Sequence, residues 1–489
     1  MNKPMRRVAV FCGLLIVALL ARANWVQFVQ ADELQNHSDN RRVLIERFAH
    51  PRGDIIVDGE PITGSTETDD TDFRYKRTYT DGELWASVTG FSSQVYGSTM
   101  LEGVEDDFLT GDDDRLFFNN TIDMLTGEDQ RGGNVVTTLN TAAQRAAVEG
   151  LGDARGAVAA IDPRTGAILA LASTPSYDPS TIAGSNDGEA WNALLRENNP
   201  DDPTLNRALR ATYPPGSTFK IVTAAAALEN GVVDDVDTET DTPTPYDLPD
   251  TNGERVDNQL DGRCENATLR VALIDSCNTV FAALSDEVGN EEMIDTAESF
   301  GYNQGQDLQV PIRVEESVYP EDNRPQNAQA GFGQASNRAT PLQMAMVAAS
   351  VANNGSLMEP YMVDRLVAPN LNVVEQHEPE EMSRPMSRET AQQLQSAMES
   401  VVEEGPSGPA AAIDGVRVGG KTGTAQRGEN NSENPYAWFI SYAMLDDESP
   451  VAVAVVVEDA EVERNEISGS GLAAPIAHDV MQAVLDSAN

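Results

Sequence analysis

Pro214-Pro215-Gly216-Ser217-Thr218-Phe219-Lys220 is the segment from which the architecture is most readily inferred. Ser217 and Lys220 are three positions apart, so a helix that begins here carries both side chains on one face. The Pro-Pro-Gly sequence stops any helix arriving from upstream and leaves the N-terminus of the next helix open. A serine hydroxyl needs an adjacent base to become a nucleophile, and a lysine of lowered pKa can be that base. The alternative is an ordinary N-cap serine followed by an exposed lysine.

Lysine is rare in this sequence, which favours the first interpretation. Lys+Arg total 33, and only four are lysines: Lys3, Lys76, Lys220 and Lys421. Arginine cannot accept a proton under ordinary conditions, whereas a buried lysine can. A lysine in this chain is therefore an exception that calls for a chemical reason.

The second informative lysine, Lys421, lies in Gly-Gly-Lys-Thr-Gly-Thr at the end of a predicted strand. Strand alternation places Lys421 and Gly423 on the same face. A cation beside a glycine leaves room for a substrate backbone to lie along the strand. The hydroxyls of Thr422 and Thr424 can bind a carboxylate. Without a partner site, the same segment is a glycine-rich turn with a solvated lysine.

Ser276-Cys277-Asn278 is a third candidate motif, inside or between predicted helices. Taken alone it is a common pattern, and Asn278 would then be a helix cap. Cys264 and Cys277 are thirteen positions apart and, in an exported chain, form a disulfide or remain two buried thiols. None of the four histidines lies beside a serine motif, which argues against a Ser-His-Asp triad and a zinc site. We expect neither a metal nor a cofactor.

The pattern of apolar residues predicts an α+β domain over 150–489, in which helices pack on an antiparallel sheet. A β-hairpin is predicted over 156–172, and an Ala-rich helix that stops at Gly231 over 217–230. Further helices are predicted over 269–284, 342–352, 387–403 and 473–485, and strands over 416–424, 436–444 and 451–458.

The N-terminal region reads as a membrane signal followed by a polar module. Positive charges at 1–7 precede an apolar run, which predicts a cytoplasmic tail and an anchor over 8–29. A cleaved signal peptide is the alternative, since Ala21-Arg22-Ala23 resembles a cleavage site. Residues 30–145 predict a small β-rich, membrane-proximal pedestal. The bulk of the chain would lie outside the cell membrane.

The formal net charge of −46 excludes nucleic acid and anionic lipid as favoured partners. Acidic runs at 69–72, 105–107 and 112–114 read as solvated loops, because their spacing matches no common calcium loop.

The order of the three motifs resembles that of the penicillin-recognising serine acyltransferases. Additional segments resemble class B penicillin-binding proteins, and among these the actinobacterial penicillin-binding protein A group. They are Arg52-Gly53-Asp54-Ile55, the hairpin from Gly156 to Pro163, 173–179, 205–208, 331–334 and 437–439. The likeness extends over nearly the whole chain and is strongest from about residue 150.

This resemblance implies a peptidoglycan D,D-transpeptidase that β-lactams acylate. Ser217 would be the nucleophile, Lys220 its base, and Ser276, Asn278 and Lys421 further catalytic residues. Thr422, Gly423 and Thr424 would bind substrate, and the backbone N–H groups of Ser217 and Thr424 would form the oxyanion hole.

The implied partners are a donor stem peptide ending in D-Ala-D-Ala, an acceptor amine and a partner glycosyltransferase. The likeness also implies a role in cell division. A D,D-carboxypeptidase, a β-lactamase and a β-lactam sensor are the competing functions.

Overall fold

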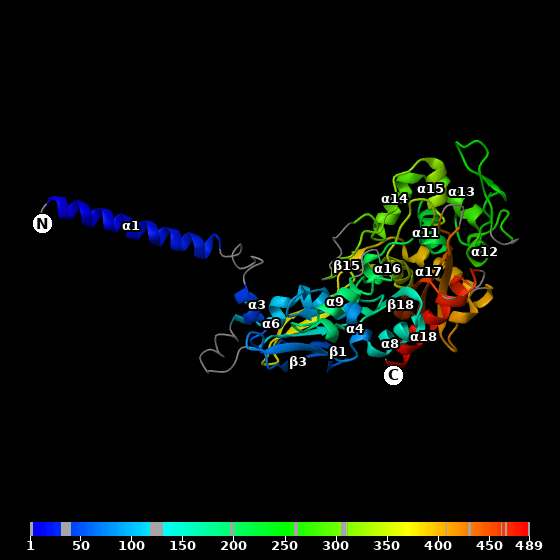
Figure 1. Cartoon of the computed structure of the whole chain (residues 1–489). Coiled ribbons are helices and arrows are strands. Elements are labelled where there is room, and N and C mark those ends of the chain that lie inside the picture. Colours follow the sequence, from blue (N-terminus) through cyan, green and yellow to red (C-terminus); the bar gives the residue numbers. More distant parts are fainter. Residues whose placement is uncertain are drawn as a thin grey trace.

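The computed structural model describes residues 3–30, 41–117, 131–195, 199, 201–258, 263–304, 310, 312–406, 408–428, 432–460, 462–464 and 467–487 (Figure 1). The polar N-terminal part contains α3 (Arg41–Arg47), β1 (Ile55–Val57), β2 (Glu60–Pro61), β3 (Thr63–Glu67), β4 (Tyr75–Tyr79), α4 (Gly82–Thr89), β5 (Ser92–Ser93), β6 (Gly97–Ser98), α5 (Met100–Val104), α6 (Asp106–Thr110), η1 (Asp114–Leu116) and β7 (Asn134–Thr137).

The C-terminal part begins with α8 (Thr141–Leu151), β8 (Arg155–Ile161), β9 (Ile168–Thr174), η2 (Pro179–Ile182), α9 (Gly188–Leu194), α10 (Arg207–Arg210), η3 (Gly216–Phe219), α11 (Lys220–Glu229), β10 (Tyr246–Asp247), β11 (Arg255–Val256), α12 (Leu269–Ile274), α13 (Asn278–Val288), α14 (Asn290–Ser299), α15 (Arg324–Ala330) and α16 (Pro341–Ala352). It continues with β12 (Leu357–Met358), β13 (Val363–Val367), β14 (Val373–Gln376), β15 (Glu381–Ser383), α17 (Arg388–Glu404), η4 (Pro409–Ala411), β16 (Arg417–Ala425), β17 (Tyr436–Leu445), β18 (Glu448–Asp459), the π-helical turn η7 (Gly469–Ala473) and α18 (Ala474–Ser487).

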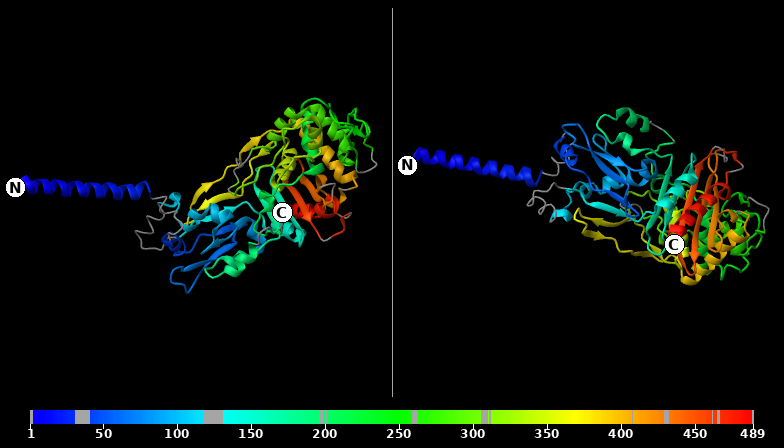
Figure 2. Two further views of the ribbon diagram at one scale, coloured as in Figure 1. Left: turned by 45° about the horizontal axis from the view of Figure 1, so that its top comes forward. Right: turned by 90° about the horizontal axis from the view of Figure 1, so that it is seen from below.

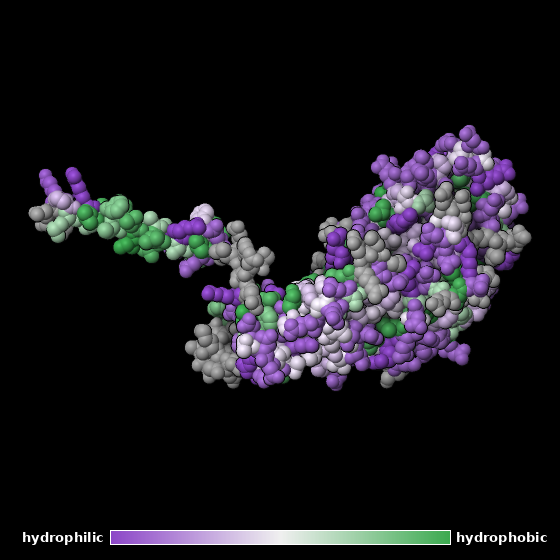
Figure 3. All heavy atoms as spheres, in the orientation of Figure 1, coloured by the Kyte–Doolittle hydropathy of each residue, from purple (hydrophilic) through white to green (hydrophobic). Residues whose placement is uncertain are grey.

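The N-terminal helix α1 (Lys3–Phe28) stands away from the rest and is apolar along most of its length (Figure 3). Its length and composition suffice to cross a membrane. Lys3, Arg6 and Arg7 are at its N-terminal end.

A five-stranded antiparallel sheet of order β16-β17-β18-β8-β9 is the centre of the C-terminal part. Alternate residues of β8 enter two separate cores, because successive side chains of a strand point to opposite faces. Ala157 and Ala159 belong to one core, and Val158 and Ala160 to the other. Helix α16 contacts β8 and β18, while α18 and α8 lie side by side near the C-terminus (Figure 1). The predicted α+β fold is confirmed.

One predicted helix is wrong in detail, at the place where a site motif lies. The sequence predicts a continuous helix over 269–284, but the structure has α12 and α13 with a break between them. Ser276 in the break has φ of +55°, which non-glycine residues rarely adopt and which no α-helix accommodates. Ser276 therefore belongs to neither helix.

A second difference concerns how the two parts of the chain are joined. The pedestal sheet has the order β14-β13-β7-β1-β2, so two of its strands come from the C-terminal part. Strand β13 runs antiparallel to β7, with Val363 opposite Thr137 and Val367 opposite Asn134. Strands β13 and β14 form a hairpin, which Figure 2 shows in yellow, extending from the C-terminal part onto the pedestal. The pedestal of 30–145 predicted from sequence does not include these strands.

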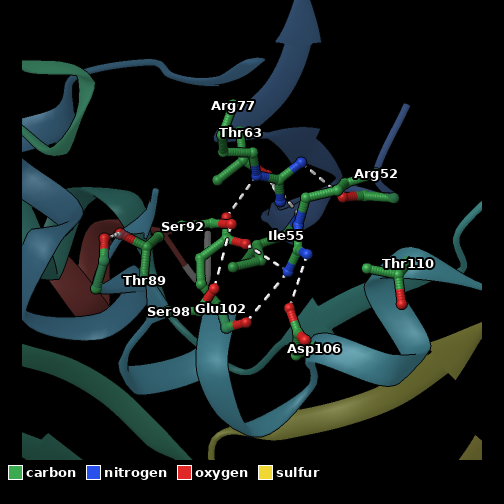
Figure 4. Close-up of polar contacts among 12 residues, drawn as sticks. Arg52, Ile55, Thr63, Arg77, Thr89, Ser92, Ser98, Glu102, Asp106 and Thr110 are labelled. Atoms are coloured by element: carbon green, nitrogen blue, oxygen red, sulfur yellow. Dashed lines mark hydrogen bonds and ion pairs between the residues drawn. The ribbon is translucent and has the colours of Figure 1, made fainter. Parts of the chain in front are cut away.

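The pedestal is held together by a buried ion network (Figure 4). The fully buried carboxylate of Glu102 on α5 lies between the guanidinium groups of Arg52 and Arg77. Asp106 adds a second carboxylate, 2.8 Å from Arg52 and 2.9 Å from Arg47. The expectation that the 105–107 run is a solvated loop is therefore wrong for Asp106, which is 9% exposed. Periodicity could not reveal this, because the partners lie about fifty positions away.

Candidate active site

Ser217 lies in η3, the single turn that precedes α11. Gly216 has φ of +54° and donates its N–H to the carbonyl oxygen of Gly333 at 3.0 Å. A Cβ at Gly333 would lie 2.0 Å from the carbonyl oxygen of Gly216, so only glycine allows this approach. Ser217 is half-buried, and within the described residues its Oγ makes no hydrogen bond. The hydroxyl is presented at the surface of a rigid turn.

Lys220 is completely buried at the start of α11. Its Nζ donates to the carbonyl oxygen of Ser276 and to Oδ1 of Asn278, both at 2.7 Å. Burial and the nearby charge of Lys421 lower the pKa of Lys220 well below its ordinary value. A neutral amine has two hydrogens and one lone pair, so two carbonyl acceptors leave the lone pair available to accept a proton from a hydroxyl.

Lys421 on β16 is equally buried and faces the same serine. Its Nζ donates to Ser276 Oγ and to the carbonyl oxygen of Thr422, both at 3.0 Å. Burial lowers the pKa of Lys421 to about 7. Ser276 Oγ also lies 3.2 Å from Nζ of Lys220, so one hydroxyl connects the two lysines. This arrangement can pass a proton from one end of the site to the other.

Asn278 and the cysteine pair flank the break between α12 and α13. Asn278 is the first residue of α13, where its Oδ1 faces Lys220 and its Nδ2 donates to the carbonyl oxygen of Asp257 at 3.4 Å. Cys264 and Cys277 are joined in a disulfide, the first of the two arrangements that the sequence leaves open. The disulfide therefore ties Cys277, which lies between Ser276 and Asn278, to the loop that contains Cys264.

Strand β16 provides the edge on which a substrate can lie. Among the described residues it pairs with β17 on one side only, with Gly423 opposite Trp438 and Thr424 opposite Ala437. A Cβ on Gly423 would come within 3.1 Å of the Pro215 carbonyl oxygen, so the strand packs closely on the turn that leads into Ser217. Thr422 and Thr424 are half-buried at this edge.

The structure thus brings Ser217, Lys220, Ser276, Asn278 and 421–424 into one site. Sequence reasoning used Gly331-Phe332-Gly333-Gln334 only for the family resemblance and gave it no structural role, whereas Gly333 accepts a hydrogen bond from the turn that carries Ser217. The two glycines that flank Phe332 could have indicated that the backbone comes close to another segment here. Within the described ranges, no group of three His, Cys, Asp or Glu residues is placed to hold a metal ion.

A serine at the start of a helix, a lysine three residues later, a Ser-x-Asn segment and a Lys-Thr-Gly strand define a penicillin-recognising serine acyltransferase. Two family models match the chain: the penicillin-binding protein transpeptidase domain over 156–482 and the penicillin-binding protein A dimerisation domain over 52–135. The chain belongs to the class B penicillin-binding proteins.

Individual relatives are similar over almost their full length. The chain is 39% identical to the peptidoglycan D,D-transpeptidase PbpA of Mycolicibacterium smegmatis, over 99% of both chains. It is equally identical to PbpA of Mycobacterium tuberculosis strain H37Rv, again over 99% of both. The solved ceftriaxone acyl-enzyme of penicillin-binding protein A from M. tuberculosis has a TM-score of 0.83 at 37% identity, covering 90% of this chain and all of that one. A transpeptidase domain from Eggerthella lenta has a TM-score of 0.76 at 32% identity, covering 90% and 99%.

Proposed function

We propose that this protein is a peptidoglycan D,D-transpeptidase that works through a serine acyl-enzyme. The observation that carries the proposal is the shared Ser276 hydroxyl, 3.2 Å from Lys220 and 3.0 Å from Lys421, beside a serine free to react. The activity named for the mycobacterial relatives supports it.

In the first step Ser217 Oγ attacks the carbonyl carbon of the penultimate D-Ala of a donor stem peptide. Lys220 Nζ accepts the hydroxyl proton, and the backbone N–H groups of Ser217 and Thr424 stabilise the oxyanion, each contributing about 3 kcal/mol. The peptide C–N bond then breaks. Ser276 gives its proton to the leaving nitrogen and regains one from Lys220, so that the terminal D-Ala, whose carboxylate Thr422 and Thr424 had bound, can depart.

In the second step an amine from another stem peptide attacks the acyl-enzyme carbonyl. The attacking amine gives up a proton to Lys220, which passes it to Ser217 Oγ as the ester C–O bond breaks, and the new amide bond is the cross-link. Asn278 holds the donor amide, and Gly423 leaves room for its backbone along β16. A β-lactam carbonyl enters the same position, but the opened ring stays attached and blocks the acceptor.

The deciding experiment incubates the full chain in detergent or nanodiscs with a D-Ala-D-Ala donor and a defined acceptor peptide. Mass spectrometry should detect the cross-linked dimer and free D-Ala, and a fluorescent penicillin should label wild type stably but not Ser217→Ala. Release of D-Ala without dimer at saturating acceptor would establish a carboxypeptidase instead. Rapid turnover of the penicillin would establish a β-lactamase.

The same proposal covers location and partners. Helix α1 would anchor the protein once in the cell membrane, with 1–7 in the cytoplasm and the catalytic part outside, as Lys3, Arg6 and Arg7 favour. A separate glycosyltransferase would supply the glycan strands. Protease accessibility of the C-terminal part in intact spheroplasts tests this orientation.

The acylation rate should depend on pH through the lysine pair. Burial lowers the pKa of Lys421 from 10.5 to about 7, and the pKa of Lys220 is also lowered. Since the proton-accepting form of Lys220 is the neutral one, acylation should rise about tenfold per pH unit below the lowered pKa of Lys220 and level off above that pKa. Stopped-flow labelling from about pH 5 to pH 9 measures this. A flat profile, or a rise centred near 10.5, would contradict it.

The same shift affects stability with a definite sign. A lysine whose folded-state pKa is lowered binds its proton less tightly in the folded state than in the unfolded state. The free energy of unfolding should therefore rise with pH between about 7 and 10.5.

Removing the disulfide should slow acylation as well as destabilise the domain. Cys277 lies directly between Ser276 and Asn278, and Ser276 keeps an unfavourable φ of +55°. In the double variant Cys264→Ser/Cys277→Ser we expect acylation to fall about tenfold, because small displacements of reacting groups reduce rates strongly. The free energy of unfolding should fall by about 3 kcal/mol. Cys12→Ser in α1 is the matched control, and equal acylation rates in both variants would sink the prediction.

A further inference from the structure

Tyr213 lies four positions before the nucleophile and is fixed by its backbone. Its N–H donates to the carbonyl oxygen of Ala339 at 2.9 Å, and the Ala339 N–H donates back at 2.8 Å. The side chain is only 4% exposed. The proposed mechanism gives this buried tyrosine no task.

The ring of Tyr213 packs against two aromatic residues of β17. Its centroid lies 5.1 Å from that of Tyr436 and 6.0 Å from that of Trp438, both edge to face. Trp438 Nε1 donates to the carbonyl oxygen of Pro214 at 3.0 Å. The aromatic group thus fixes the direction of the peptide that leads into Gly216 and Ser217.

The Tyr213 hydroxyl is held by a carboxylate at the end of β18. It donates to Oε2 of Glu458 at 3.3 Å. Glu458 also lies 3.2 Å from Nε of Arg155 and 3.6 Å from Nε of Arg207, and its side chain is 17% exposed. Burial raises the pKa of Tyr213, so the hydroxyl keeps its proton and remains a donor.

We infer that Tyr213 and Glu458 are positioning residues for acylation, which hold the turn before Ser217 so that its Oγ and N–H keep their reactive geometry. Neither touches the reacting atoms. The hydrogen bond from the Tyr213 hydroxyl to the Glu458 carboxylate fixes the Tyr213 ring. The ring and Trp438 together fix the Pro214 peptide, and that peptide sets the position of Ser217. This inference rests on the proposed acyl-enzyme function and adds to it.

Tyr213→Phe is the direct test, because it removes one hydroxyl and leaves both ion pairs of Glu458. In single-turnover labelling with a fluorescent penicillin at several concentrations, the acylation rate constant should fall about tenfold, since modest misplacement of reacting groups is costly. The dissociation constant of the noncovalent complex should stay unchanged. The wild type must be labelled and Ser217→Ala unlabelled, so that failure of the proposed function is recognised separately.

Tyr442→Phe is the matched control. Tyr442 is a buried tyrosine of β17, the strand that carries Tyr436 and Trp438, and it donates its hydroxyl to the backbone carbonyl oxygen of Gln395 at 3.2 Å. Both variants should lose similar stability, but only Tyr213→Phe should lose acylation rate. Equal rates in the two variants, or an effect confined to the dissociation constant, would overturn the inference.

A double-mutant cycle tests the role of Glu458. If Glu458 acts through the Tyr213 hydroxyl, Glu458→Gln should slow acylation in the wild type and add little in the Tyr213→Phe background. Full additivity would assign the effect of Glu458 to another route and remove it from the inference. If Glu458→Gln does not fold, because Arg207 is left buried beside a neutral group, the comparison of the two tyrosine variants decides the matter by itself.

Discussion

Lys220→Arg is expected to lower the rate of Ser217 acylation by about 10²- to 10⁴-fold, the range that general base catalysis contributes. Arginine keeps the positive charge and most of the length, but it does not give up its proton near neutral pH. The position is also shaped for an amine, since two carbonyl oxygens lie 2.7 Å from Nζ and the Ser276 hydroxyl lies 3.2 Å from it. Stopped-flow labelling with a fluorescent penicillin measures the loss.

Lys76→Arg on β4 provides the control, because it makes the same change at a lysine outside the site. It should acylate at the wild-type rate. Thermal denaturation should establish that Lys220→Arg is folded under the assay conditions. Labelling of that folded variant at near the wild-type rate would exclude Lys220 as the base.

Glu102→Ala is expected to destabilise the pedestal by about 3–5 kcal/mol, the usual cost of leaving a buried ion pair without one partner. The guanidinium group of Arg77 is completely buried and that of Arg52 is 2% exposed, so neither gains water when the carboxylate is removed. Denaturant unfolding, followed by hydrogen exchange at amides of the pedestal, measures the change.

Glu67→Ala is the comparison variant in the same part of the chain. Glu67 pairs with Arg74 at the surface, with side chains 64% and 56% exposed, and such pairs contribute at most about 1 kcal/mol. The two variants should therefore differ clearly in the denaturant concentration at which the pedestal unfolds. Coincident unfolding curves would show that the buried network is not a main source of stability.

Much of the site could be predicted from sequence because its chemistry demands particular residue types. A buried lysine can accept a proton where arginine cannot, only four of the 33 Lys and Arg residues are lysines, and Ser217 with Lys220 satisfied a helical spacing. The hairpin at 156–172 and the strands from 416 onward were also predictable, because runs of β-branched residues and alanine bounded by turns signal buried strands. These predictions used local information.

The features that were missed depend on contacts between distant segments. The break at Ser276 lies where the two lysines and the disulfide meet the segment, and no helix-breaking residue announces it. Tyr213 and Glu458 are far apart in sequence and meet only in the folded sheet. Asp106 looked like part of a solvated acidic run because its arginine partners precede it by some fifty positions. Periodicity cannot report such long-range pairing.

The β13–β14 hairpin, which pairs with β7 of the pedestal, limits how genes for such proteins can recombine. A crossover near residue 150 would combine β7 from one parent with β13 from the other, so the edges joined by Val363–Thr137 and Val367–Asn134 would have to match between the parents. A catalytic part expressed alone would expose the bare edge of β13, which favours aggregation. The two parts therefore share one sheet and have to match at it, although the linear order of the chain suggests that they are separable.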